Sequence, residues 1–247
     1  MSPLCATEPM EHGRVLTLAL DNPPGNAVTP ALLEAVDEAL AASIGEGGPD
    51  VIVLTGRGNI FSKGFDVGVI RSHGDADAHR AALAACNEIV NRLEEYPKPI
   101  IAAVSGHCLG AGLELAMACH LRLCVEKARL GLPEIGRGLL PGMGGVPRLA
   151  RLVGGAKALE LTAVGDLITA EEAHRIGLVN RVLPRAGFME AVLAFARALL
   201  SVDQALIREI VRLSMSLPLE RRRAGIAESM ESALRLAPPA TSAAGAR

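Results

Sequence analysis

The chain has 247 residues, of which 50% are hydrophobic and only 2% are aromatic. This length allows one large domain or two small ones, and the core must be built from aliphatic side chains because there is almost no aromatic volume. The formal net charge is −2, from 25 basic and 27 acidic residues, so the balance does not favour a polyanionic partner such as a nucleic acid.

The cysteines and the apolar segments indicate in which cellular compartment the protein is expected. Five cysteines are scattered along the chain, which is not typical of a secreted disulfide framework. Residues 1–12 lack the basic start and apolar stretch of a signal peptide. A membrane span needs about 20 uninterrupted apolar residues, and the most apolar segment, residues 99–125, is interrupted by charged and histidine side chains. We therefore expect a cytoplasmic protein.

A metal site is not expected either. Three of the cysteines and one histidine lie within 17 residues of one another, but their spacing matches no zinc pattern and cysteine is commonly a small core residue. These residues are Cys108, Cys119, His120 and Cys124.

Strand and helix patterns alternate in the first half of the chain, and helical patterns dominate the second half. Strands are predicted at residues 15–20, 51–55, 100–104, 121–125 and 128–130. Helices are predicted at residues 31–42, 76–93 and 113–119, and Thr29 and Pro30 fit the start of the first helix as N-cap and first helical residue. Residues 59–68 and 133–145 are predicted to be loops. After residue 146 the pattern is helical almost to the end.

No low-complexity linker divides these halves, so the simplest organisation is one α/β domain with a helical extension. We predict an α/β core over residues 1–190, a helical C-terminal region over residues 191–237 and a flexible tail over residues 238–247.

Two of the predicted strands run into glycine-rich loops. The strand at 51–55 leads to residues 61–66, and the strand at 100–104 leads to residues 106–112 and then a helix. Small residues let the backbone approach a ligand, and a helix N-terminus offers unpaired N–H groups. Two such loops could direct N–H groups at one carbonyl oxygen, as an oxyanion hole does. Glycine-rich turns before helices more often serve tight packing alone.

Two glutamates lie among apolar residues. Glu114 lies one turn into an apolar helix, and Glu134 lies in a Pro-Glu-Ile sequence. A carboxylate is costly to bury without a partner or a task. Glu114 could instead interact with the helix N-terminus, and Glu134 could be an exposed loop residue. Two carboxyl groups beside a polarised carbonyl group would suit acid–base chemistry.

Several of these segments resemble the enoyl-CoA hydratase/isomerase (crotonase) superfamily. The similarity runs from about residue 14 to residue 184 and includes the segments 101–118, 132–148 and 61–66 together with Asn26. The resemblance implies a crotonase-like spiral of ββα units with a helical C-terminal trimerisation region. It also implies a homotrimer, or a hexamer made from two trimers, without a nucleic-acid or membrane partner.

The resemblance implies roles for individual residues. The backbone N–H groups of Phe65 and Ala111 would form the oxyanion hole for a thioester oxygen. Glu114 would activate water, and Glu134 would supply a proton to the α-carbon. No cofactor is implied, because coenzyme A is part of the substrate. The residues that match the family's coenzyme A and substrate pocket are Asn26, Val28, Ser62, Lys63, Gly64, Asp66, Val67, Gly110 and Pro133.

The implied activity is that of a lyase of fatty acid metabolism, which hydrates a trans-2-enoyl-CoA thioester to the 3-hydroxyacyl-CoA. One alternative is a Δ3-Δ2 enoyl-CoA isomerase that uses Glu134 alone. Another is a dehydratase of a branched 3-hydroxyacyl thioester, carried on coenzyme A or on a protein. A non-catalytic or RNA-binding member of the family is disfavoured by the near-neutral charge and the few aromatic residues.

The chain also departs from the family pattern. Ala111 stands where the family commonly has glycine, which keeps the N–H group but adds a methyl group. Lys63 and Phe65 replace small residues, and His120 replaces an aspartate at a position that we interpret as structural. The usual aromatic and basic stretch near the C-terminus is missing.

Overall fold

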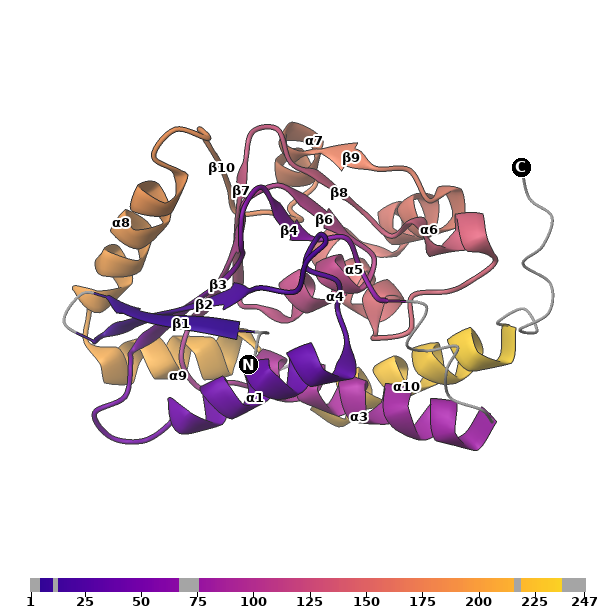
Figure 1. The fold of residues 1–247 in the computed structure, drawn as a ribbon, viewed down its shortest axis with the longest axis horizontal. Coiled ribbons are helices and arrows are strands. Elements are labelled where there is room, and N and C mark those ends of the chain that lie inside the picture. Colours follow the sequence, from indigo (N-terminus) through magenta and orange to yellow (C-terminus); the bar gives the residue numbers. More distant parts are fainter. Residues whose placement is uncertain (1–4, 11–12, 67–75, 216–218, 237–247) are drawn as a thin grey trace.

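Two β-sheets organise the computed structural model, which describes residues 5–10, 13–66, 76–215 and 219–236 (Figure 1). The six-stranded sheet has the order β1 (Cys5–Met10), β2 (Val15–Leu20), β3 (Val51–Gly56), β5 (Ile100–Val104), β7 (Leu121–Val125), β10 (Arg181–Leu183). Its strands are parallel except that β1 runs antiparallel to β2. The four-stranded sheet has the order β4 (Ile60–Ser62), β6 (His107–Leu109), β8 (Arg129–Gly131), β9 (Ile168–Thr169).

From β3 to β8, successive strands alternate between the two sheets. The strand pairs β3 and β4, β5 and β6, and β7 and β8 each give their first strand to the six-stranded sheet and their second to the four-stranded sheet. A helix follows the first two pairs, α3 (Ala76–Glu94) and α4 (Ala111–Ala118). This repetition is the spiral of ββα units, so the expected α/β fold class is confirmed.

The strands at the centre of the six-stranded sheet are aliphatic because they are covered on both faces. Every residue of β3 and β5 is buried, as is usual for parallel strands between layers. The pairing sets Val53 opposite Ile101 and Thr55 opposite Ala103. The Thr55 hydroxyl donates to the Ala103 carbonyl group at 2.8 Å, which satisfies a polar group inside the sheet.

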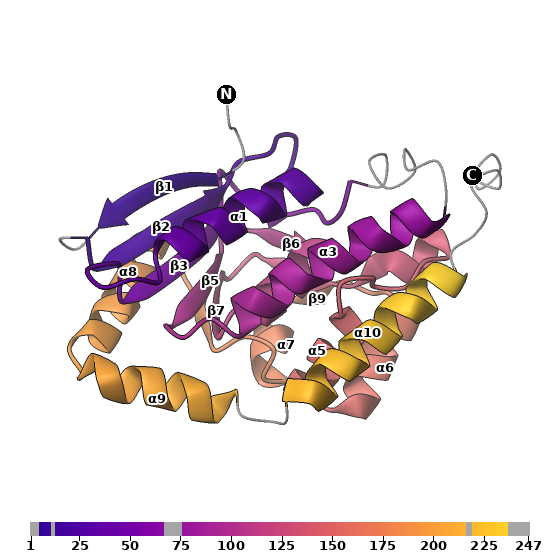
Figure 2. The same ribbon diagram turned by 90° about the horizontal axis from the view of Figure 1, so that it is seen from below.

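Three long helices lie side by side along one face of the molecule (Figures 1 and 2): α1 (Pro30–Ala42), α3 and α10 (Leu219–Leu236). The predicted start of α1 is confirmed, since the Thr29 hydroxyl accepts the N–H of Leu32 at 3.2 Å. The other helices of the described residues are the 3₁₀ helix η1 (Pro133–Arg137), α5 (Gly145–Val153), α6 (Gly155–Val164), α7 (Ala170–Arg175), α8 (Phe188–Leu200) and α9 (Gln204–Ser214).

The C-terminal end of α4 is held by two side chains that follow it. His120 Nδ1 accepts the N–H of Ile100 at 2.9 Å, and burial lowers the pKa of His120 to about 4, so the ring is neutral. Arg122 donates to the carbonyl group of Cys119 at 2.6 Å. These bonds fix the helix that carries Glu114 against the start of β5.

Several short elements differ from the sequence prediction. The predicted loops contain β4 and η1, the small-residue turn after β5 contains β6, and the C-terminal half contains β9 and β10 in addition to its helices. Helix α4 begins at Ala111, two residues before the predicted start. Strands of two or three residues are too short to show an alternating pattern, and their partners are distant in sequence.

The predicted boundary at residue 190 falls inside α8, and the division into core and helical region stays a prediction. The predicted tail, residues 238–247, lies outside the described residues. Among the helices of the described part, none combines the length and the apolar character that crossing a membrane requires.

Candidate active site

Glu114 is buried in the first turn of α4, with 2% of its surface exposed. Its Oε1 atom accepts two backbone hydrogen bonds, from the N–H of Met143 at 2.8 Å and from the N–H of Gly145 at 2.7 Å. Gly145 is the first residue of α5. The carboxyl group is therefore held by N–H groups at the N-terminal end of the neighbouring helix, where such groups lack partners within the helix.

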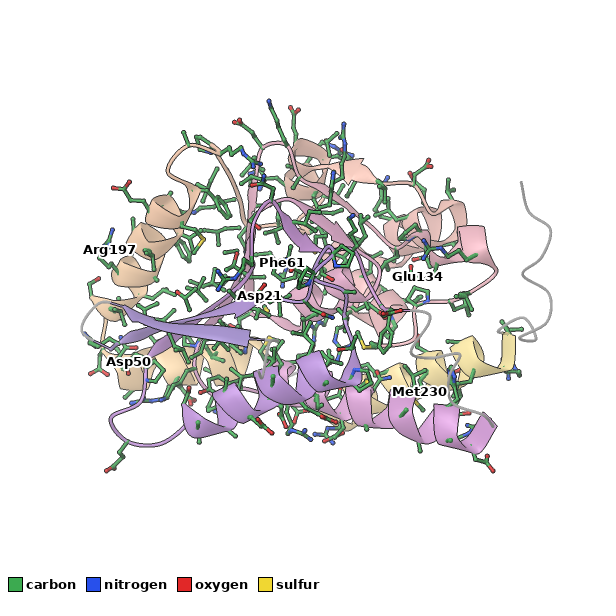
Figure 3. The ribbon with its side chains drawn as sticks, in the orientation of Figure 1. Asp21, Asp50, Phe61, Glu134, Arg197 and Met230 are labelled. Atoms are coloured by element: carbon green, nitrogen blue, oxygen red, sulfur yellow. The ribbon has the colours of Figure 1, made fainter. Side chains whose placement is uncertain are left out.

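Glu134 lies in η1, directly after Pro133, and its side chain turns inward (Figure 3). Its Oε1 atom lies so close to Gly110 that an added Cβ there would be 2.7 Å from it. Its Oε2 atom is buried and has no hydrogen-bond partner among the described residues. A fully exposed loop residue, the alternative that the sequence allowed, does not fit this position.

The two glutamates influence each other's charge. Burial and the nearby Glu134 raise the pKa of Glu114 to about 8, although the two N–H groups and Arg148 act in the opposite direction. Burial also raises the pKa of Glu134 to about 7, opposed by Arg137. Near neutral pH the pair therefore retains a proton, and an acid–base reaction needs one group that donates and one that accepts.

The segments that carry the Phe65 and Ala111 N–H groups lie against each other. An added Cβ at Gly64 would be 3.5 Å from the nitrogen of Ala111. Phe65 pairs with Val28 in an isolated parallel bridge, in which the N–H of Val28 donates to the carbonyl group of Gly64 and the carbonyl group of Val28 accepts the N–H of Asp66. The N–H of Phe65 therefore points away from that bridge.

Ala111 is the first residue of α4, where a helix leaves its N–H groups unpaired. Gly110 precedes it with a φ of +53°, a conformation that favours glycine. Among the described residues, neither the N–H of Phe65 nor that of Ala111 has a hydrogen-bond partner. Both groups can donate to a ligand oxygen.

Two predicted pocket residues hold the loop together with their side chains. Asn26 is buried and donates to the carbonyl groups of Arg57 and Ile60 at 3.1 and 2.8 Å. The hydroxyl of the buried Ser62 accepts the N–H of Gly64 at 3.1 Å. These side chains shape the backbone around Gly64 and Phe65.

The other predicted pocket residues lie along the same segments. Val28 is fully buried, whereas Lys63 and Asp66 are exposed. The Lys63 side chain covers Gly25, where an added Cβ would be 2.6 Å from Lys63 Cδ. Val67 lies outside the described residues.

The sequence patterns did not indicate the residues that hold the 141–145 segment, which supplies both N–H groups to Glu114. The buried side chains of Asn87 in α3 and Arg148 in α5 donate to carbonyl groups of this segment, and Asn91 and Glu94 of α3 hold Arg148. The sequence signal that could have identified them is the spacing of Asn87, Asn91 and Glu94 by four and three positions, which places three polar side chains on one side of an amphipathic helix.

The described residues contain no group of three histidine, cysteine, aspartate or glutamate side chains that could hold a metal ion. Cys86, Cys108, Cys119 and Cys124 are free and buried, and burial raises the pKa of Cys119 to about 12. Thiol groups in this state are neutral core side chains.

Known proteins resemble the chain in sequence and in fold. A probable enoyl-CoA hydratase from Bacillus subtilis is 44% identical over 167 residues, which cover 67% of this chain and 64% of that protein. The peroxisomal fatty acid beta-oxidation multifunctional protein AIM1 of Arabidopsis thaliana is 34% identical, covering 93% of this chain and 32% of that protein. The chain thus matches less than two thirds of the length of either relative.

The fold comparison agrees. The crystal structure of an enoyl-CoA hydratase/isomerase from Xanthobacter autotrophicus Py2 superimposes with a TM-score of 0.85 at 31% identity, covering 94% of this chain and 86% of that one. The family model described as enoyl-CoA hydratase/isomerase matches residues 11–233. The chain therefore belongs to the enoyl-CoA hydratase/isomerase family.

Proposed function

We propose that the chain adds water to a trans-2-enoyl-CoA thioester to give the 3-hydroxyacyl-CoA. The observation that carries this proposal is the pair of inward-facing carboxyl groups with raised pKa, Glu114 and Glu134, beside two backbone N–H groups that have no hydrogen-bond partner within the described part of the chain. Membership of the enoyl-CoA hydratase/isomerase family supports the same reaction class.

In the proposed mechanism the thioester oxygen accepts hydrogen bonds from the N–H groups of Phe65 and Ala111. Glu114 takes a proton from a water molecule while the oxygen of that water bonds to the β-carbon. The electron pair of the carbon–carbon double bond moves toward the thioester oxygen. Glu134 then donates a proton to the α-carbon as the carbonyl group re-forms. Each N–H group is expected to contribute about 10²–10³-fold to the rate.

The division of roles follows from the surroundings of each carboxyl group. Two N–H groups donate to Glu114 and Arg148 lies nearby, and both favour its carboxylate against the burial and the Glu134 charge that raise its pKa. The pKa values of about 8 and about 7 describe an interacting pair that shares one proton, and in the reactive form this proton lies on Glu134. The Oε2 atom of Glu134 is buried without a partner among the described residues, so it is free to carry a proton to a bound substrate. No cofactor takes part in this scheme, because coenzyme A enters with the substrate.

We further propose that the coenzyme A portion lies along the segments that meet at the isolated bridge. The residues concerned are Asn26, Val28, Ser62, Lys63, Gly64, Asp66 and Val67, with Gly110 and Pro133 closer to the acyl group. The backbone contacts between these segments support the assignment, since the N–H of Lys63 donates to Gly25 at 3.0 Å and that of Val28 donates to Gly64 at 2.9 Å.

The pH dependence of crotonyl-CoA hydration tests the proposed function. A plot of kcat/KM against pH is expected to be bell-shaped, because the pair must hold one proton. Activity falls at acidic pH, where both carboxyl groups are protonated and no base remains, and at basic pH, where both are ionised and no acid remains. The pKa values of about 8 and about 7 place the maximum near neutral to slightly alkaline pH. A profile without either limb would contradict the proposal.

The C-terminal region leads us to propose a homotrimer, or a hexamer of two trimers. Helix α9 exposes Leu206, Ile210 and Leu213, which share one face and are each more than half exposed. Further copies of this 25.7 kDa chain would cover this apolar face. The family resemblance, in which helices of this region build trimers, supports that choice of partner.

Substituting Ile210→Glu is expected to shift the assembly toward monomers, because a carboxylate on this face would be buried in the contact. Sedimentation equilibrium measures the change, and Arg208→Gln is the control that keeps the wild-type mass, because this exposed residue lies two positions before Ile210 and so on the other side of the helix. A wild-type chain that sediments as a monomer would refute the proposed assembly.

A further inference from the structure

One face of helix α3 holds the segment from which Glu114 receives its hydrogen bonds. Asn87 donates to the carbonyl group of Gly142 at 2.8 Å. Asn91 and Glu94 accept hydrogen bonds from Arg148 at 2.8 and 3.1 Å. The three α3 residues are spaced by four and three positions, so they lie on the same side of the helix.

Arg148 connects this face to Glu114. It is 2% exposed, and its guanidinium group donates to the carbonyl group of Met143 in addition to Asn91 and Glu94. The N–H of Met143 in turn donates to Glu114. Arg148 therefore holds Met143, and Met143 in turn holds the carboxyl group of Glu114.

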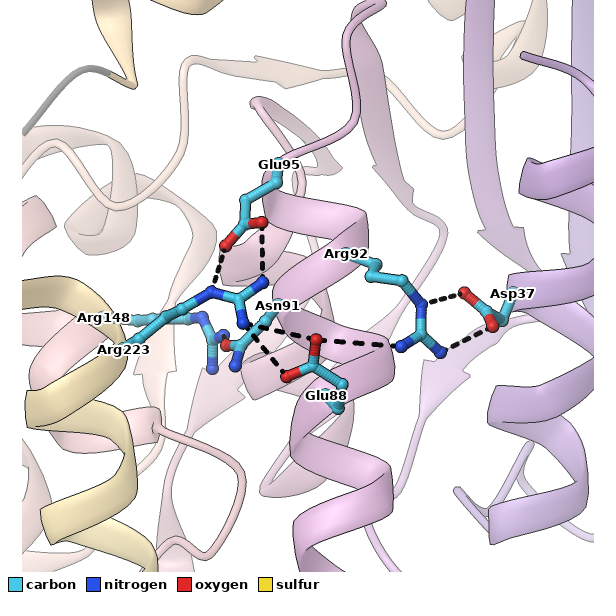
Figure 4. A network of polar contacts seen from close by, with 7 residues as sticks. All are labelled: Asp37, Glu88, Asn91, Arg92, Glu95, Arg148 and Arg223. Carbon is cyan, nitrogen blue, oxygen red and sulfur yellow. Dashed lines mark hydrogen bonds and ion pairs between the residues drawn. The ribbon is translucent and has the colours of Figure 1, made fainter. Parts of the chain in front are cut away.

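The helix that anchors Arg148 is itself fixed on its outer side (Figure 4). Arg223 of α10 donates to Glu95 at 2.9 Å and pairs with Glu88, and Arg92 forms two hydrogen bonds with Asp37 of α1. Contacts to both neighbouring helices limit the movement of α3, so its inner face can serve as a rigid support.

The charges around Glu114 act in opposite directions. Glu134, on η1, disfavours a second negative charge, whereas the cation of Arg148, on α5, favours the carboxylate. Arg148 is partly neutralised by Glu94 of α3, which also pairs with Arg151. Removing Arg148 and removing the charge of Glu94 should therefore affect Glu114 with opposite signs.

We propose that Arg148 is a positioning residue that sets the place and the charge of Glu114, and that Glu94 tunes its effect. This inference rests on the proposed function, since it assumes that Glu114 acts as the base in hydration. Arg148 would reach the reacting water only through Met143 and Glu114, so it is not itself catalytic.

The test measures kcat/KM for crotonyl-CoA hydration against pH in the full chain. In Arg148→Gln the acidic limb is expected to move to higher pH by about one unit, because the carboxylate loses a favourable cation. In Glu94→Gln the limb is expected to move to lower pH, because Arg148 is no longer neutralised. Arg148→Lys keeps the positive charge but loses the planar guanidinium group that donates to several partners at once. The acidic limb should therefore stay in place, while kcat falls by a larger factor than KM changes.

Arg175→Gln is the matched control, because it removes an exposed arginine of α7 that pairs with Glu172 and leaves α3 and the 141–145 segment unchanged, and its acidic limb should coincide with that of the wild type. Shifts of the same sign in Arg148→Gln and Glu94→Gln, or no shift in either, would overturn the inference. If Arg148→Gln does not fold by circular dichroism, the downward shift in Glu94→Gln and the unmoved limb in Arg148→Lys still decide it.

The proposed function is tested separately by Glu114→Gln. If that variant still hydrates crotonyl-CoA, Glu114 is not the base and the proposed mechanism fails together with this inference. If it loses hydration while the limbs of the Arg148 and Glu94 variants do not move as stated, only the inference fails.

Discussion

Replacing Glu114 by glutamine is expected to lower kcat for crotonyl-CoA hydration by about 10³-fold. The amide oxygen of glutamine can still accept the N–H groups of Met143 and Gly145, which hold the native side chain at 2.8 and 2.7 Å. It cannot take a proton from water. The variant therefore removes the base and preserves its surroundings, and KM is expected to change much less than kcat.

The same variant separates hydration from isomerisation. An isomerase that uses Glu134 alone would shift the double bond of a 3-enoyl-CoA at close to the wild-type rate in Glu114→Gln. A loss of hydration smaller than about tenfold would contradict the role assigned to Glu114. Both activities are measured on one preparation, so a difference between them does not depend on the fraction of folded protein.

Thermal melting against pH is the control for folding. The pKa of Glu114 rises from 4.5 to about 8 on folding, so the stabilisation linked to its proton is present below about pH 4.5 and is lost as the pH rises through about 8. Glutamine has no such proton. The wild type should therefore lose stability relative to Glu114→Gln as the pH increases across this window.

Local sequence was sufficient where the residues involved are neighbours. The Thr29 hydroxyl cap, the buried aliphatic strands and the position of Glu114 in an apolar helix all depend on residues within one or two turns. In these places propensity and burial act in the same direction as the final fold. The two carboxyl groups of the candidate site could be selected on this basis together with the family resemblance.

Contacts between distant segments were not predictable in the same way. The N–H of Gly145 and the carboxyl group of Glu114 are 31 positions apart, and Arg148 and Glu94 are 54 positions apart. The burial of Glu134 depends on how η1 packs against Gly110, a contact that no local pattern encodes. Such pairs are set by the topology of the two sheets, which brings β6, α4 and η1 together.

The backbone conformation at the start of α4 explains why Ala111 fits a position where the resembled family commonly has glycine. The first helical residue needs an ordinary backbone conformation, whereas the positive φ of the turn falls on Gly110. The methyl group of Ala111 is buried, with 3% of the residue exposed. An alanine therefore keeps the N–H group available without straining the backbone.

Replacing Glu134 by glutamine is expected to lower kcat by about 10³-fold through a different step. The α-carbon then lacks its proton donor, so incorporation of solvent deuterium at that carbon should fall together with hydration. Glu160→Gln is the control, because this exposed α6 carboxylate is paired with Lys157, and its removal should leave both rates unchanged. Deuterium incorporation at the wild-type rate in Glu134→Gln would exclude Glu134 as the donor.

The double variant Glu114→Gln with Glu134→Gln tests whether the two carboxyl groups act as one unit. Groups that share one proton and serve one reaction show strongly non-additive losses. The double variant should therefore retain about the same residual activity as either single variant, from the two N–H groups and substrate binding alone. A loss equal to the product of the two single effects would mean that each glutamate contributes independently, which a mechanism in which the two groups share one proton does not allow.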